Sequence, residues 1–195
     1  MMQWLSKSWK ENRAFIFFLV LMFVFRSTFA DWNTVPTGSM KPTILIGDRI
    51  LVNKMAYDIR FPFSHFSMIY MGDPVRGDII VFDSKVSDKR LVKRVIGMPG
   101  DVVALENNVL TINGKTVPYE EISNDGKTQD RVEDLEGLLH IVRTDNAGSA
   151  LSNFDSVQVP EGHYLAMGDN RDNSADSRVI GFIPRGEIVG RSSTV

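Results

Sequence analysis

Leu91-Val92-Lys93-Arg94-Val95-Ile96-Gly97 is the stretch that decides how this chain folds. Its content of Val and Ile, and its alternation, predict a β-strand. Alternation along that strand places Lys93 on the same face as Leu91 and Val95, a face that we expect to be dry. A strand lysine that reaches solvent through its long apolar stem is the alternative, and this segment alone leaves both interpretations open.

Most of the chain after residue 31 also indicates β structure. Short apolar or alternating runs rich in Val and Ile recur at 49–52, 78–82, 91–96, 102–105, 109–112, 157–159, 164–167 and 187–190. Asn107-Asn108 and Asn113-Gly114 lie between or after such runs, as hairpin turns do. We therefore predict a mainly β fold with an antiparallel, strongly twisted, barrel-like core. The more polar residues 115–156 are expected to form a smaller inserted β cap, and helix is expected only near the N-terminus and around residues 131–139.

Thr37-Gly38-Ser39-Met40 is the strongest candidate for a reactive centre. It lies between Pro36 and Lys41-Pro42-Thr43, so two prolines punctuate the loop that carries the serine. Such a loop presents a hydroxyl on a tight turn and leaves backbone N–H groups available to a ligand. Ser39 is therefore a candidate nucleophile.

A serine nucleophile needs a base, and histidine is scarce in this chain. The three histidines lie in an aromatic cluster, at the start of an apparent strand and in a turn, and we interpret them as structural or solvated: His65, His140 and His163. Lys93 is the better candidate. An ammonium among apolar side chains loses hydration, so its pKa falls and a usable fraction becomes neutral near physiological pH.

A third segment, Gly168 to Arg178, combines acids with two arginines and two serines. Side chains of these types hydrogen-bond their own backbone, so the segment predicts an ordered loop with internal ion pairs. A calcium loop is the competing interpretation. Its acids, Asp169, Asp172 and Asp176, lack the every-second-residue spacing of an EF-hand, and no glycine occupies the turn position, which disfavours calcium.

Together these segments resemble the bacterial type I signal peptidase (leader peptidase) family. The matching blocks are Pro36 to Thr43 followed by Gly47-Asp48, then Arg76 to Phe82, Lys93 to Asp101, and Gly168 to Arg178. Four blocks in the order of the family, between residues 36 and 191, make this resemblance very specific. It implies a membrane-anchored serine endopeptidase with a Ser/Lys dyad, which removes signal peptides from secretory preproteins after an Ala-X-Ala-like site.

The resemblance also implies a role for each matching residue. Ser39 matches the nucleophile, and Lys93 matches the general base that takes its proton. Thr37 matches a hydroxyl that forms the oxyanion hole with the backbone N–H of Ser39, and Ser174 matches the residue that hydrogen-bonds the lysine amine and aims it. The other matched positions are the supporting ion-pair residues Arg94, Asp176 and Arg178, and the substrate-pocket residues Val35, Met40, Ile44, Val81 and Val92.

One uniformly apolar run, residues 14–25, precedes these blocks; basic residues lie before it and Arg26 follows it. The run is short for a membrane span, which needs about 20 residues, and it would also suit a cleaved signal peptide. The resemblance favours a retained transmembrane anchor over residues 14–30. Residues 1–13 would then be cytoplasmic, and residues 31–195 would form the catalytic β domain on the outer, periplasmic side of the bacterial cytoplasmic (inner) membrane.

Residues 61–63 and 66–71 concentrate aromatic and methionine side chains in an expected loop region. Such a patch could enter the membrane interface or pack in the core, and both interpretations stay open.

Composition narrows the remaining function classes. The formal net charge of the 195 residues is -2 and there is no basic tract, so nucleic acid is not an expected partner. There is no cysteine, zinc pattern or phosphate-binding glycine loop, so we predict neither metal nor cofactor. A repressor-type Ser/Lys autoprotease would need a DNA-binding domain in place of the apolar run. The alternative that remains is a non-enzymatic exported β-domain with a cleaved signal peptide, in which Ser39 and Lys93 are incidental.

Overall fold

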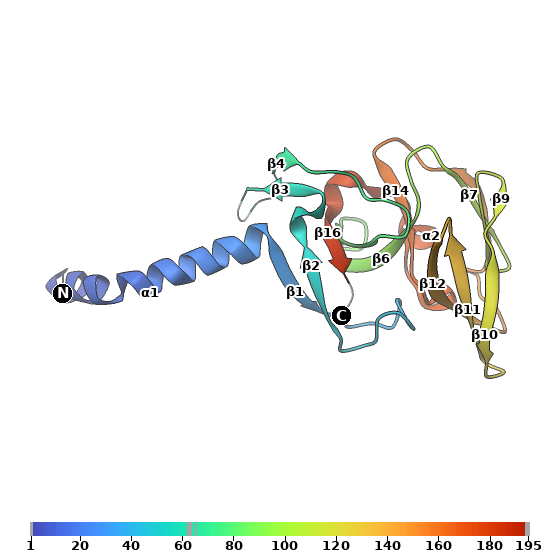
Figure 1. The fold of residues 1–195 in the computed structure, drawn as a ribbon, viewed down its shortest axis with the longest axis horizontal. Helices are drawn as coiled ribbons and strands as arrows, with labels where there is room; N and C mark the ends of the chain where they lie inside the picture. Colours follow the sequence, from blue (N-terminus) through green and yellow to red (C-terminus); the bar gives the residue numbers. More distant parts are fainter. Residues whose placement is uncertain (1, 62–63, 65, 194–195) are drawn as a thin grey trace.

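The computed structural model describes residues 2–61, 64 and 66–193. A long helix, α1 (Met2–Thr28), projects from a body made almost entirely of strands (Figure 1). In chain order the strands are β1 (Ala30–Thr34), β2 (Arg49–Asn53), β3 (Asp58–Arg60), β4 (Ser67–Tyr70), β5 (Ile79–Ser84), β6 (Lys89–Gly97), β7 (Val102–Glu106), β8 (Val109–Ile112), β9 (Lys115–Thr116), β10 (Tyr119–Asn124), β11 (Thr128–Leu135), β12 (Leu138–Asp145), β13 (Phe154–Gln158), β14 (His163–Met167), β15 (Ile183–Pro184) and β16 (Ile188–Ser193). Short helical turns are η1 (Lys54–Ala56), η2 (Arg171–Asn173), α2 (Ser177–Ile180) and η3 (Arg185–Glu187).

The strands form several antiparallel sheets. The largest has the order β1-β2-β16-β5-β6-β14-β15, and a second has the order β13-β7-β8-β9. The cap strands β10-β11-β12 form a third sheet, and β3-β4 a fourth. The mainly β prediction is confirmed, and each predicted strand is present. Among the described residues the pairing of the largest sheet runs from β1 to β15 without returning to β1, so the strands divide into sheets instead of pairing into one closed barrel.

The two asparagine turns have the backbone that the sequence predicts. Asn107 and Asn108 have φ of 49° and 59° and connect β7 to β8, while Asn113 and Gly114 have φ of 53° and 77° and connect β8 to β9. Positive φ at both central residues matches the right-handed twist of a two-residue hairpin. These turns fix the register of the second sheet.

The predicted helix around residues 131–139 is wrong. This segment belongs to the hairpin of β11 and β12, in which Leu135 pairs with Leu138 across a turn. Glu136 and Gly137 have φ of 55° and 96°, which ends any helix at this point. Glu133 and Leu135 are buried and the residues beside them are less so, a period of two that identifies a strand.

Residues 119–145 of the expected cap form the sheet β10-β11-β12, which lies at the end of the body away from α1 (Figure 1). The flanks of the expected 115–156 segment pair elsewhere, because β9 and β13 belong to the sheet of β7 and β8. The division of the chain into domains stays a prediction.

Helix α1 ends where a lysine from the body meets it. Lys54 Nζ donates to the carbonyls of Arg26 and Ser27 at 3.1 and 3.2 Å, which satisfies two of the orphan acceptors of the last helical turn. The chain then enters β1 at Ala30, so the helix stops before the predicted boundary at residue 30.

In the described part of the chain, no helix combines the length and the apolar character needed to cross a membrane. The predicted span over residues 14–30 is therefore not confirmed. The reason is visible in the sequence: the uniformly apolar run covers only residues 14–25, with Arg13 and Arg26 at its two ends.

The described residues of the aromatic patch lie on the surface. Phe61 and residues 66, 68, 69, 70 and 71 are each more than half exposed, so the core-packing interpretation is wrong for them. Pro62, Phe63 and His65 lie outside the described residues.

Candidate active site

A serine and a lysine from distant segments meet at the largest sheet. Ser39 lies in the loop between β1 and β2, whose ends are joined by bonds from Val35 N to Asp48 O and from Gly47 N to Val35 O, both 2.9 Å. Lys93 lies on β6, and its Nζ donates to Ser39 Oγ at 2.7 Å. The structure thus brings together the two residues that the sequence singled out as nucleophile and base.

Lys93 is enclosed by the fold. It is 2% exposed, and every residue of β6 from Lys93 to Gly97 is buried. Burial lowers the pKa of Lys93 to about 8, while the charges of Asp176 and Asp169 act in the opposite direction and that of Arg178 lowers it further. The prediction that Lys93 lies on a dry face of its strand is confirmed.

The amine of Lys93 has one further partner. It donates to the carbonyl of Val92 at 2.9 Å, a bond from a side chain to the backbone of the preceding residue. Ser174 is buried, but of the described contacts Lys93 Nζ makes its hydrogen bonds to Ser39 and Val92 and not to the hydroxyl of Ser174. The predicted bond from Ser174 is therefore not formed in this structure.

The segment from Gly168 to Asp176, which we call the site loop, lies directly against the loop between β1 and β2 that carries Ser39, which we call the serine loop. Asn170 N donates to Ser39 O at 3.1 Å, and Asn170 Nδ2 donates to Gly38 O at 3.0 Å. Thr43 Oγ1 donates to Asp169 Oδ2 at 2.5 Å. Three bonds, one of them to the backbone of Ser39, therefore fix the serine loop relative to the site loop.

Gly168 shows how close this approach is. A Cβ atom at this position would collide with the hydroxyl of Ser174 and with the carbonyl oxygen of Ser39. Only glycine leaves room for the two segments to meet, because a backbone carbonyl cannot move aside as a flexible side chain can.

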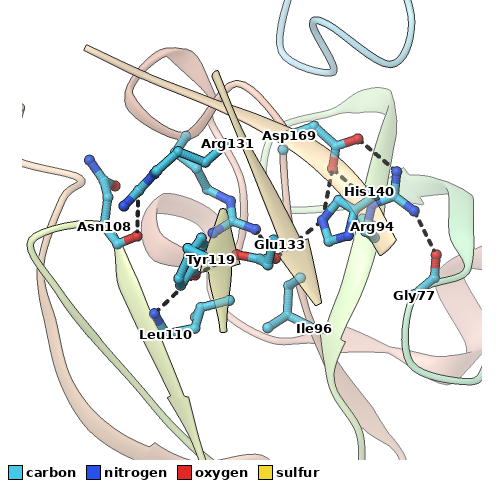
Figure 2. Close-up of polar contacts among 12 residues, drawn as sticks. Gly77, Arg94, Ile96, Asn108, Leu110, Tyr119, Arg131, Glu133, His140 and Asp169 are labelled. Carbon is cyan, nitrogen blue, oxygen red and sulfur yellow. Dashed lines mark hydrogen bonds and ion pairs between the residues drawn. The ribbon is translucent and has the colours of Figure 1, made fainter. Parts of the chain in front are cut away.

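Two buried ion pairs lie behind the dyad. Arg94 donates from Nε and Nη2 to the two oxygens of Asp169 at 2.9 and 2.7 Å and from Nη1 to Gly77 O at 2.9 Å (Figure 2). Arg178 makes a similar two-point contact with Asp176 at 2.9 and 2.7 Å, and Asp176 also accepts from Gly168 N. The predicted supporting residues are thus paired, although the partner of Arg94 is Asp169 and not Asp176.

The remaining predicted residues divide into two groups. Thr37 is exposed, two positions before Ser39. The five predicted pocket residues belong to one apolar cluster, in which Val92 packs against the four buried ones: Val35, Met40, Ile44 and Val81. Met40 and Ile44 are each only 1% exposed, so these side chains of the serine loop are packed in the core.

Sequence reasoning assigned no role to Asp169 and Asn170, although both lie in the quoted third segment. It also did not anticipate a buried contact from the cap sheet, where Glu133 on β11 pairs with Arg171 of the site loop at 2.5 Å. His140 on β12 lies beside the same carboxylate, with Nε2 at 3.1 Å (Figure 2). Burial alone would raise the pKa of Glu133, but Arg171 and His140 hold it well below its usual range.

A hydroxyl that accepts a hydrogen bond from a buried lysine amine, on a scaffold of antiparallel strands, defines a Ser/Lys hydrolase. Such a site needs no histidine, because a desolvated lysine amine is itself a usable base near neutral pH.

Comparisons with known proteins agree with this class. The family described as signal peptidase, peptidase S26, matches residues 7–195. A signal peptidase I from Pseudomonas fluorescens is 38% identical over 94% of this chain and 70% of its own length, and one from Pseudomonas aeruginosa is 36% identical over the same shares. The crystal structure of a signal peptidase I from Enterococcus faecalis covers 63% of this chain and 99% of its own, with 28% identity and a TM-score of 0.43.

The chain belongs to the signal peptidase I (peptidase S26) family, whose members are serine peptidases that cleave signal peptides.

Proposed function

We propose that this protein cleaves signal peptides with Ser39 as nucleophile and Lys93 as general base. One observation carries the proposal: the 2.7 Å contact between Lys93 Nζ and Ser39 Oγ at a buried lysine whose pKa is lowered to about 8. A neutral amine can accept the proton of the hydroxyl, and it lies within the distance that proton transfer requires.

The reaction then proceeds in two halves. Ser39 Oγ attacks the scissile carbonyl while its proton passes to Lys93 Nζ. This attack forms a tetrahedral oxyanion. When that intermediate collapses, the C–N bond breaks, the ammonium of Lys93 returns the proton to the leaving amine, and an acyl-enzyme remains. Water then attacks the ester while the amine of Lys93 takes its proton. The bond between the acyl carbon and Ser39 Oγ breaks, and Lys93 returns the proton to Oγ.

The oxyanion needs donors, and we assign them to the hydroxyl of Thr37 and the backbone N–H of Ser39. Thr37 is exposed in the serine loop, so a bound peptide could bring its carbonyl to this side chain and exclude water from it. Loss of one such donor costs about 3 kcal/mol of transition-state stabilisation.

The surrounding residues would hold the dyad in place. Asp176 joins Arg178 to Gly168 N, and Arg94 holds Asp169, which accepts from Thr43 in the serine loop. Ser174 lies in the site loop, and we retain for it the role of orienting Lys93 when substrate is bound. The carbonyl of Val92 takes that role in the free enzyme.

The substrate class follows from family membership: signal peptidases act on preproteins. We further propose that cleavage follows an Ala-X-Ala-like site. We retain Val35, Met40, Ile44, Val81 and Val92, which belong to one apolar cluster, as the residues that would line shallow pockets for the small side chains of such a site.

We propose that α1, from residue 14 to its end at Thr28, attaches the protein to the bacterial cytoplasmic membrane as a tilted anchor. Phe15, Phe17, Phe18 and Phe23 are each more than half exposed on a helix that projects from the body, a surface that is costly in water. Residues 1–13 would be cytoplasmic and residues 31–195 periplasmic. The exposed side chains of residues 66–71 would lie in the interface between the same membrane and water.

The test is cleavage of a preprotein with an Ala-X-Ala site by the full-length protein in lipid vesicles, beside folded Ser39→Ala and Lys93→Ala variants. We expect cleavage after the second alanine by the wild type alone. Equal behaviour of all three proteins would overturn the dyad and favour a non-enzymatic exported domain. Recovery of the protein in the supernatant after the vesicles are sedimented would contradict the anchor without affecting the dyad.

A further inference from the structure

A buried ionic network joins the cap sheet to the site loop. Arg171 Nη2 contacts Glu133 Oε1 at 2.5 Å, and both residues are 0% exposed. Tyr119 on β10 donates its hydroxyl to the other oxygen of Glu133 at 2.5 Å (Figure 2). The guanidinium of the site loop therefore ends on a carboxylate that belongs to a different sheet.

Arg171 occupies the middle of the site loop. The preceding residue, Asn170, holds the carbonyls of Gly38 and Ser39, and the carbonyl of Arg171 itself accepts from Arg178 Nη2 at 2.6 Å. A displacement of Arg171 would thus be transmitted to the backbone of the serine on one side and to the ion pair near Lys93 on the other.

His140 makes a second link from the same hairpin. Its Nε2 lies 3.1 Å from Glu133 and 3.9 Å from Asp169 Oδ1, the carboxylate that Arg94 holds (Figure 2). Glu133 on β11 and His140 on β12 are direct cross-strand partners, so one rigid pair contacts two positions of the site loop, Asp169 and Arg171.

We propose that Glu133 and His140 are positioning residues, which act through Arg171 and Asp169 to hold Ser39 and Lys93 in their reactive geometry. The cap sheet then supplies residues that position the catalytic groups. This inference rests on the proposed dyad of Ser39 and Lys93.

Stability alone is a poor reason for such a network. Two charges taken out of water lose hydration that their mutual attraction barely restores, and apolar residues of similar size serve a core as well or better. An ion pair differs from an apolar contact in that it fixes the relative orientation of its two side chains, because a guanidinium and a carboxylate bind in few orientations. The network holds Arg171 of the site loop, and the placement of this loop sets the distance between Ser39 and Lys93. A positioning role therefore explains why charged residues are buried here.

Glu133→Gln tests the proposal, with Glu120→Gln on the exposed face of β10 as the matched control. We expect kcat of Glu133→Gln to fall by up to about 100-fold with KM unchanged, since a 1 Å misplacement of reacting groups costs that much. The pH midpoint of kcat/KM should also move to lower pH, because Asp169 and Asp176 would stabilise the ammonium of Lys93 less. His140→Gln should change both quantities in the same direction and by less, and Glu120→Gln should change neither.

A double variant, Glu133→Leu with Arg171→Met, separates folding from positioning. It leaves no buried charge unpaired, so it should fold even if Glu133→Gln does not, and its kcat should stay low. Wild-type kcat in the folded double variant would overturn the proposal, as would a Glu133→Gln protein that loses thermal stability while its kcat and pH midpoint are unchanged. An active Ser39→Ala variant in the same assay would instead contradict the proposed dyad.

Discussion

Strand β6 carries the same dipeptide twice, Lys89-Arg90 at its outer end and Lys93-Arg94 at its inner end. The outer pair is exposed, and Arg90 forms its ion pair with Asp83 partly in solvent, with side chains 40% and 34% exposed. The inner pair is buried, and the ion pair of Arg94 with Asp169 is 6% and 1% exposed. Four residues along one strand therefore separate surface charges from a reactive centre.

The difference lies in what covers the strand. The inner end of β6 has β5 and β14 on its two sides, and the serine loop and the site loop both contact its side chains. Water is excluded there, so a lysine loses its hydration and an arginine must find a fixed partner. The same two residue types occur at both ends of the strand, but only at the buried end is the lysine desolvated and the arginine held by a buried carboxylate.

The largest expected effect is on activity. Lys93→Ala should lower kcat/KM for a preprotein on the order of 10⁴-fold, because it removes the proposed general base. Lys89→Ala should leave it unchanged. Equal activity of the two variants in a cleavage assay, on proteins with native circular dichroism, would contradict the difference between the inner and outer lysines of β6.

The second effect concerns the two arginines and is measured as free energy of unfolding. Arg94→Met leaves the carboxylate of Asp169 buried without its main partner, so we expect a loss of about 3–5 kcal/mol. Arg90→Met removes a half-exposed pair and should cost about 1 kcal/mol or less. Equal losses in chemical denaturation would show that burial of the inner pair has no energetic consequence.

The third effect is a gain. The pKa of Lys93 is about 8 in the folded protein against an ordinary value of 10.5, so below pH 8 the buried ammonium destabilises the fold by at most about 3 kcal/mol. Between pH 8 and 10.5 the unfolded chain holds a proton that the folded protein has released, so stability rises with pH in this window.

Lys93→Met should therefore be more stable than the wild type at pH 7, with a difference that shrinks as the pH approaches 10.5. Thermal unfolding at several pH values measures this difference, with Lys89→Met as the control that should show none. A Lys93→Met protein that is less stable at pH 7 would mean that the bonds of the amine outweigh its lost hydration.

The smallest effect is the pH dependence of the wild type. Only the neutral amine of Lys93 accepts a proton, so kcat/KM should fall about tenfold for each pH unit below 8 and level off above it. Lys89→Ala should leave this profile in place. A profile that is flat from pH 6 to 9 would contradict lysine as the base.

Much of this arrangement could be predicted from sequence, because local patterns carry it. The alternation around Lys93 predicts a dry strand, and the asparagine pair at 107 and 108 predicts a hairpin turn; both are confirmed. The helix expected over residues 131–139 failed because cross-strand pairing with β12 decided the outcome.

Contacts between distant segments were beyond such patterns. Nothing in the polar sequence around Glu133 indicates a fully buried carboxylate, since its partner Arg171 lies 38 positions away. Asp169 was visible as an acid but not as the partner of Arg94, because several carboxylates in one loop are equivalent in a linear sequence. Ser174 was expected to bond Lys93, yet the described bonds of the amine go to Ser39 and to the backbone carbonyl of Val92.

Because Asn170 N–H donates to the carbonyl of Ser39, the backbone amide of Asn170 could serve as an NMR reporter of the reaction. Acylation of the serine hydroxyl would alter the electron density and position of that carbonyl, and the nitrogen resonance of Asn170 would move with it. An isotope-labelled sample could thus be followed through turnover by a nucleus that takes no part in the chemistry, and its chemical shift would distinguish free from acylated enzyme.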